Sequence, residues 1–127
     1  MGVATHDWLQ TQVARGHIPF GYAHSAELWA SDIAELTTIL SHRRVDRGRS
    51  THNGAEPNLM LLGLKRRVMD TECRLGGQES ISYKLAYGVA VQGLGAGELA
   101  ERFQIRTATA ADMIRLSLQV VHDAYAD

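Results

Sequence analysis

The stretch GAGELAERFQIRTATAADMIRLSL, residues 95–118, decides the fold of this chain. Its apolar spacing predicts a short helix over 98–103, a tight corner, and a longer helix that Thr107 caps and that runs to about Ala126. Ala100 supplies the small side chain that two steeply crossing helices need where they touch. Gln104 stands where such a corner often carries glycine. The stretch therefore predicts a helix-turn-helix.

Apolar residues recur at helical spacing in the rest of the chain as well. Helices are expected over 5–15, 25–40, 59–75 and 78–92, with breaks at 16–24, 41–57, 76–77 and 93–97. No segment alternates apolar and polar residues with the period of a strand. The expected fold is all-α, a small helical domain with a C-terminal helix-turn-helix. Residues 1–56 and 57–127 are expected to be its two parts, joined in one compact unit.

The same spacing selects the side chains expected to form the core. The expected core residues are Trp29, Ile33, Leu36, Leu40, Leu61, Leu64, Val68, Met69, Leu75, Ile81, Leu85, Val89, Ala110, Ile114, Leu118, Val121 and Tyr125. Phe20 is expected to pack on the body from the 16–24 connection, and Cys73 to be a small buried hydrophobe.

Composition restricts the function classes. The chain has 127 residues, 45% of them hydrophobic, and a formal net charge of -1, so anion binding requires a local patch. A single cysteine excludes an internal disulfide, and no apolar run approaches the ~18 residues of a membrane span. The histidines lack metal-ligand spacing, GLGAG lacks the remainder of a phosphate-binding motif, and no nucleophile motif is present. We therefore expect no metal, no cofactor, no catalytic residues and no enzymatic activity.

Such a local patch is present between residues 41 and 67. Seven basic residues stand there against two acidic ones, Asp46 and Glu56, a surplus of five positive charges. The basic residues are Arg43, Arg44, Arg47, Arg49, Lys65, Arg66 and Arg67. A cluster of this kind attracts phosphate, so these residues are candidates for DNA contact. Pairing of the arginines with carboxylates elsewhere in the chain is the alternative.

The second helix of a helix-turn-helix presents its N-terminal residues to the major groove. Here the candidate DNA contacts are Arg106, Thr107, Thr109 and Arg115. Asp112 accepts hydrogen bonds but repels phosphate, so it suits a basic group on a protein partner or a cytosine edge. This set is thin for a DNA reader, and we expect DNA binding that a larger partner assists.

Residues 79–125 resemble two bacterial and phage families. The segment contains Leu85-Ala86-Tyr87, then Leu99-Ala100 and a long final helix. In this it resembles the fourth conserved region of bacterial sigma factors, and still more the C-terminal part of phage Q-type antitermination proteins. The resemblance covers about the last ~50 residues. It implies a small transcription regulator in the cytoplasm of a bacterial host cell, which contacts promoter-region DNA, RNA polymerase, or both.

Two other functions fit the same sequence. A phage packaging subunit of the small-terminase type is also helical and DNA-binding, and forms a ring. A protein-binding inhibitor would use the same helices to block a host machine. The sequence leaves homodimer formation open.

Overall fold

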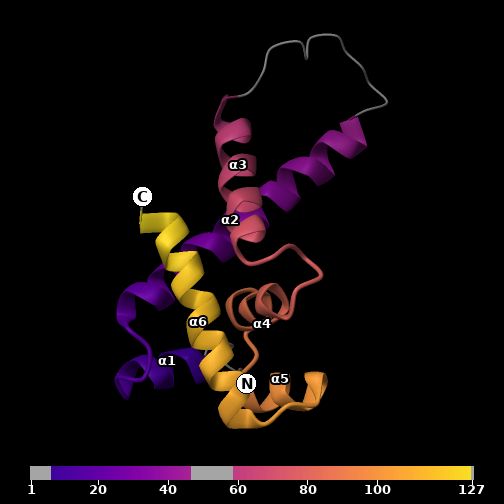
Figure 1. The fold of residues 1–127 in the computed structure, drawn as a ribbon. Coiled ribbons are helices and arrows are strands. Elements are labelled where there is room, and N and C mark those ends of the chain that lie inside the picture. The colour runs from indigo at the N-terminus through magenta and orange to yellow at the C-terminus, as the bar shows by residue number, and fades with distance from the viewer. Residues whose placement is uncertain (1–6, 47–58, 127) are drawn as a thin grey trace.

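The structure, a computed structural model, describes residues 7–46 and 59–126. Within these residues the chain forms six helices and no strand, so the predicted all-α fold class is confirmed. The helices are α1 (Asp7–Ala14), α2 (Phe20–Asp46), α3 (Leu59–Arg74), α4 (Ile81–Ala90), α5 (Ala96–Phe103) and α6 (Thr107–Ala126). Figure 1 shows how they are arranged. No described helix has the length and apolar character that crossing a membrane requires.

The last helix, α6, organises the body. It packs against α2, α3, α4 and α5, and Figure 1 shows it passing across the body from α5 toward α2. Ala110, Ile114, Leu118 and Val121 line its buried side with no exposed surface, as their spacing predicted. Burying each of the larger side chains contributes roughly 1.5–3 kcal/mol. Because α2 and α6 share this core, the N-terminal and C-terminal parts of the chain depend on each other.

The second helix is longer than the sequence indicated. The predicted connection 16–24 ends at Pro19, and α2 runs from Phe20 to Asp46 instead of over 25–40. Pro19 suits the start of a helix, where its carbonyl accepts the Tyr22 amide at 3.0 Å. Gly21 continues the helix under the His122 ring, 3.2 Å from where a Cβ would stand. Phe20 therefore begins a helix, and its side chain is 71% exposed instead of packed on the body.

Smaller differences occur at the other helix ends. The α4 helix begins at Ile81 instead of 78, because the Ser80 Oγ caps it by accepting the Tyr83 amide at 3.0 Å. The α5 helix begins two residues before the predicted 98. In α6 the Ala110 amide donates to the Arg106 carbonyl at 2.8 Å. Thr107 is therefore already in the first turn and is not the cap.

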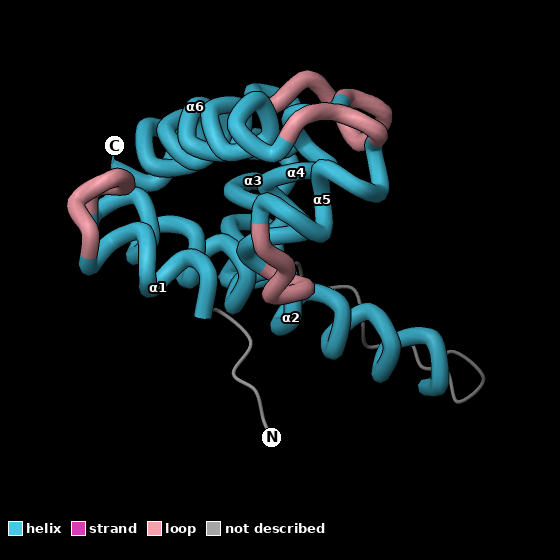
Figure 2. The backbone as a smooth tube through the Cα atoms, turned by 90° about the horizontal axis from the view of Figure 1, so that it is seen from below, coloured by secondary structure: helices cyan, strands magenta, loops and turns pink. Residues whose placement is uncertain are grey.

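Several residues expected in the core are exposed. Leu40, Met69 and Ile81 are among the exposed large hydrophobic side chains, and Cys73 is exposed as well. Leu40 lies in the part of α2 that extends away from the other helices (Figure 1, Figure 2). Met69 and Cys73 lie on the side of α3 that faces away from the body. Helical spacing identified apolar residues correctly, but it does not specify whether a second helix covers them.

One carboxylate ties three helices together. Asp32 of α2 accepts a hydrogen bond from the Tyr125 hydroxyl of α6 at 2.6 Å. It also accepts one from the Arg67 Nε of α3 at 3.2 Å, and the Asp32 side chain is only 16% exposed. Burial and this hydrogen bond raise the pKa of Tyr125 well above its usual range. The bond to Asp32 likewise raises the pKa of Arg67.

An aromatic cluster fills the contact between α2 and α4. The Trp29 ring, fully buried, meets Tyr83 and Tyr87 edge-on, with centroids 5.8 and 6.5 Å apart. Tyr83 and Tyr87 stack on each other at 5.7 Å. Such pairs contribute about 0.5–1.5 kcal/mol beyond their buried area. Burial raises the pKa of Tyr83 to about 12.

Tyr125→Phe tests the link through Asp32. The variant should lose about 1–2 kcal/mol of unfolding free energy in urea denaturation at neutral pH, because a hydrogen bond to a charged acceptor is removed. Tyr22→Phe is the matched control, because the Tyr22 hydroxyl makes no hydrogen bond within the described residues. Equal stability of the two variants would contradict the role of Asp32.

The raised tyrosine pKa values also determine how stability depends on pH. An unfolded tyrosine loses its proton near pH ~10, whereas folded Tyr83 and Tyr125 keep theirs to higher pH. The folded state therefore binds more protons above that pH, and the unfolding free energy should fall as pH rises from ~10 through the folded pKa values. Tyr125→Phe should make this decline shallower. A spectrophotometric titration of the phenols, which should show two late-ionising tyrosines, checks the assignment.

Candidate functional site

The α5–α6 corner is the first element of the candidate site. The connection between the helices is residues 104–106, and Gln104 has the left-handed conformation, with φ 59° and ψ 48°. The Ile105 amide donates to the Ala100 carbonyl at 2.9 Å and closes the turn. A left-handed residue is the geometry that glycine usually provides at the end of a helix. The backbone thus makes the predicted tight corner although the residue is glutamine.

Small residues allow α4, α5 and α6 to approach one another. Ala100 and Ala110 are buried, one on each helix of the corner. On α4, a Cβ added at Gly88 would lie 2.8 Å from the Leu99 Cδ2, and Leu99 is fully buried. The three helices therefore form one tightly packed unit, and the position of α6 relative to α5 is fixed by the core.

The first turns of α6 present the residues predicted to contact DNA. Arg106, Thr107, Thr109 and Arg115 are all exposed, and so is Asp112. Over α5 and α6 three arginines stand against four acidic residues: Arg102, Arg106 and Arg115 against Glu98, Glu101, Asp112 and Asp123. These side chains are all exposed. The unit therefore lacks the surplus of positive charge that gives strong DNA binding through phosphate contacts alone.

The α1 helix encloses one flank of α6. Asp112 and Arg115 line a recess of about 270 Å³, and Trp8, Gln12, His17, Ile18 and Ala111 complete its wall. The Gln12 Oε1 and the His17 Nδ1 lie 2.9 Å apart. Trp8 is held against the loop before α5, because a Cβ at Gly95 would lie 3.0 Å from the Trp8 Cβ. The recess is thus lined by a carboxylate, a guanidinium, an amide, an imidazole and an indole ring. Such a lining suits a polar side chain from a partner protein.

The described basic residues of the 41–67 cluster, Lys65, Arg66 and Arg67, do not form one surface with the start of α6. Lys65 and Arg66 are exposed on α3, whereas Arg67 is held by Asp32, which also binds Tyr125 near the C-terminal end of α6. Arg106 lies nineteen residues before Tyr125, about 28 Å along the helix at ~1.5 Å per residue. Within the described residues, the structure therefore keeps Lys65, Arg66 and Arg67 apart from Arg106.

Part of the cluster cannot be placed. Arg43 and Arg44 belong to the last turn of α2, but their side chains lie outside what the structure describes. Arg47 and Arg49 lie wholly outside the described residues. Among the described residues, no group of three or more histidine, cysteine, aspartate or glutamate side chains is placed to hold a metal ion.

Sequence reasoning missed the recess and the Asp32 bonds. Both depend on residues about a hundred positions apart: α1 with α6 in the recess, and Asp32 with Tyr125. Ser25 and His122 provide a third case, with 3.0 Å between the Ser25 Oγ and the His122 Nδ1. The sequence signal for these hydrogen bonds was the presence of polar residues, Ser25 and Asp32, among the apolar residues on one side of α2.

No protein-family model, curated protein or solved structure matches this chain. The functional interpretation therefore depends on the geometry and charges of the chain itself.

Gln104→Gly tests the corner. It should raise the unfolding free energy by about 0.5–1 kcal/mol, because glycine adopts the left-handed conformation without a clash. The control is Gln119→Gly, at an exposed position inside α6, which should lower stability by about 1 kcal/mol. Urea denaturation measures both. A loss of stability in Gln104→Gly would mean that the chain does not turn there in this way.

Gly95→Ala tests the attachment of α1. The new methyl group would meet Trp8 at 3.0–3.3 Å, so we expect a loss of about 1–3 kcal/mol and greater exposure of Trp8 to a fluorescence quencher. Gly97→Ala, two residues along, meets no atom within 4 Å and should be neutral or slightly stabilising. If both variants behave alike, Trp8 does not rest on this loop.

Proposed function

We propose that this protein regulates transcription by joining RNA polymerase at promoter-region DNA, with the α5–α6 unit as the contact. One observation carries the proposal: the three-residue corner with left-handed Gln104, closed on buried Ala100. That corner gives the two helices the connection typical of a helix-turn-helix and leaves the start of α6 exposed.

The charges of the unit support assisted DNA binding. Arg106 at the start of α6, with Thr107 and Thr109, suffices for one or two base or phosphate contacts, each good base contact being worth ~1–3 kcal/mol. Specific DNA sites usually differ from non-specific ones by ~4–10 kcal/mol. The remaining discrimination must come from a partner already on DNA, and RNA polymerase has that position at a promoter.

The recess beside α1 supports a protein contact on the same helix. Asp112 and Arg115 form part of its wall, so they are less available to a DNA groove than Arg106 and Thr109. We assign Arg106, Thr107 and Thr109 to DNA, and Asp112 with Arg115 to a polar side chain of the polymerase. Asp112 then faces a basic group instead of phosphate.

A second candidate function is a protein-binding inhibitor that blocks a host machine without contacting DNA. The excess of acidic over basic residues on α5 and α6 favours it. In that case the recess and the exposed side of α6 would form the whole contact surface.

A footprint on promoter DNA, with and without RNA polymerase, separates these functions. We expect weak protection by the protein alone, and an extended, sequence-specific footprint when polymerase is present. Arg106→Ala should reduce the added DNA protection, and Asp112→Ala should reduce binding to polymerase measured without DNA. Gln119→Ala, exposed on the same helix, serves as the control for both.

The other outcomes are informative. Strong, specific protection by the protein alone would indicate a conventional repressor and contradict assisted binding. Protection in neither condition, together with binding to polymerase or another host protein, would favour the inhibitor.

A further inference from the structure

The α3 helix has apolar residues on two opposite sides. Leu64, Val68, Thr71 and Leu75 form the buried side that faces α2 and α6. At about 100° per residue, Leu62, Met69 and Cys73 lie on roughly the opposite side, and we call these three residues the outer stripe. A helix that is apolar on both sides is usually covered on both. The outer stripe is not covered by any described part of this chain.

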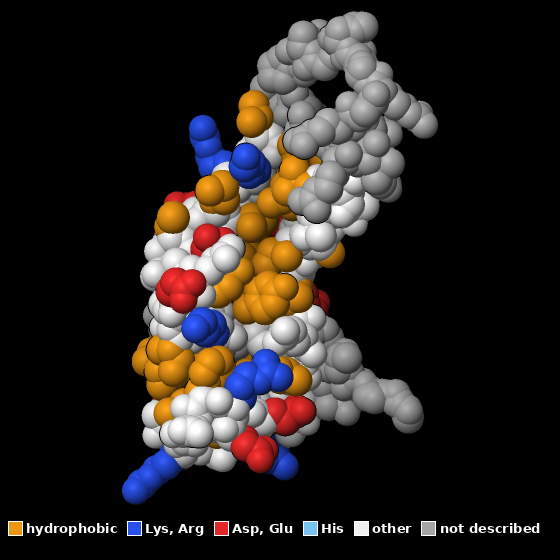
Figure 3. All heavy atoms as spheres, turned by 90° about the vertical axis from the view of Figure 1, so that its right-hand side faces the viewer, with side chains coloured by type: hydrophobic (Ala, Val, Ile, Leu, Met, Phe, Trp, Pro, Cys, Tyr) orange, Lys and Arg blue, Asp and Glu red, His pale blue; other side chains and the backbone are white. Residues whose placement is uncertain are grey.

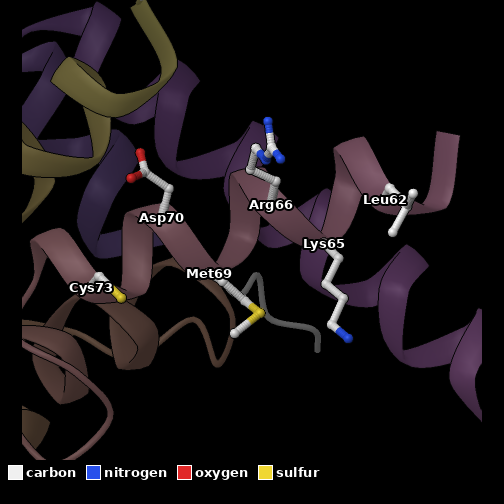
Figure 4. A pocket seen from close by; sticks show the side chains of 6 residues that line it. All are labelled: Leu62, Lys65, Arg66, Met69, Asp70 and Cys73. Carbon is white, nitrogen blue, oxygen red and sulfur yellow. The ribbon is translucent and has the colours of Figure 1, made fainter. Parts of the chain in front are cut away.

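The outer stripe is both exposed and hollowed. Leu62 is 52% and Met69 48% exposed, and Cys73 is exposed as well. A shallow groove of about 390 Å³ lies along it (Figure 4). Figure 3 shows a band of hydrophobic side chains over the upper part of the face that it draws, with charged groups near the margins of the band. The stripe thus offers an apolar contact surface with polar edges.

The charges beside the outer stripe follow a simple order along α3. Arg66 and Asp70 lie on one flank, and Figure 4 shows their side chains directed to the same side. Lys65 and Glu72 lie on the other flank by helical spacing. On each flank the cation therefore precedes the anion by about one to two turns. The first half of this surface carries two cations. The second half carries two carboxylates, Asp70 and half-buried Glu72, together with Arg74, which pairs with Asp70.

We propose that the outer stripe binds the outer stripe of a second copy of this chain, with the two α3 helices antiparallel. In an antiparallel pair related by a two-fold axis, residues of the same flank face each other. With the axis near residue 68, Arg66 faces Asp70 of the second copy and Lys65 faces Glu72 of the second copy, and each pair occurs twice. The inference is independent of the proposed function.

The charge order excludes the other orientation. A parallel pair would set the cations at 65 and 66 against each other, and likewise the anions at 70 and 72, which is unfavourable. Asp70 already accepts a bond from Arg74 at 3.0 Å, and Glu72 accepts one from Gln78 at 3.1 Å. Each carboxylate retains a second oxygen for a partner.

The same register aligns the apolar residues. Leu62 of one copy meets Cys73 of the other, and Met69 lies beside the two-fold axis. The two Cys73 side chains are about ten residues out of register, roughly 15 Å apart at ~1.5 Å per residue. The pairing therefore excludes a disulfide between the native cysteines, and it places a cysteine at position 62 opposite Cys73 of the second copy.

Sedimentation equilibrium over a concentration series tests the pairing. We expect a dimer for the wild type and a dimer dissociation constant at least about tenfold higher for Arg66→Glu and for Asp70→Arg, because like charges then face each other. The double variant Arg66→Glu/Asp70→Arg should restore dimer formation. Lys84→Glu, an equal charge reversal at an exposed position of α4, is the control and should leave the dissociation constant unchanged. Circular dichroism checks that each variant is folded.

Cysteine cross-linking tests the register. Under mild oxidation Leu62→Cys should give a disulfide-linked dimer through native Cys73, whereas Leu62→Cys/Cys73→Ser and the wild type should not. Positions 62 and 73 of one chain are about 16 Å apart and cannot bridge within the monomer. A wild-type monomer up to submillimolar concentration, a ring or larger assembly, or linked dimers of the wild type would each overturn the proposal.

Discussion

The buried side of α6 is the constraint on which the rest of this structure depends. Ala110, Ile114, Leu118 and Val121 require an apolar partner along about three turns of helix, and four other helices provide it. Because α2 provides part of this cover, the N-terminal segment cannot fold separately from the C-terminal one. These contacts leave exposed the first turn of α6 and one stripe that is polar except for Leu116.

That constraint also limits what the helix can bind. A recognition helix must enter a groove about 12 Å wide, which requires at least one open flank. Here α1 occupies one flank of α6 through Trp8 and the recess at Asp112 and Arg115. Arg106 and Thr109 are exposed and do not line the recess, so they remain open to DNA. The geometry therefore favours shared recognition, in which the start of α6 contacts DNA and the flank contacts protein.

The basic residues of α3 have different roles according to the side of the helix on which they lie. Arg67 is exposed, but it bonds to Asp32, which also binds Tyr125, so it stabilises the packing of α3 on α2 and α6. Its neighbours Lys65 and Arg66, two residues and one residue earlier, are exposed on other sides of the helix. Three consecutive basic residues thus have different environments. Adjacent basic residues in a sequence therefore need not form one basic surface, because consecutive residues of a helix point in different directions.

The sequence by itself determined the fold class, the corner and, apart from exposed Ile81, the core of the last three helices. Apolar spacing in α4, α5 and α6 is regular, and Gly76, Gly77 and Gly93, all with positive φ, mark breaks where they were expected. It did not determine where α2 begins. Pro19 and Gly21 favour a turn, but Pro19 also suits the start of a helix, and Gly21 lies against His122 within the helix. Likewise, the apolar character of Met69 and Cys73 was evident from sequence, but their exposure was not. Only the tertiary structure decided which side of α3 meets the body, that Arg67 is held by Asp32, and that α1 lies beside Asp112. Each of these is a contact between residues distant in the chain, and local periodicity carries no information about such contacts.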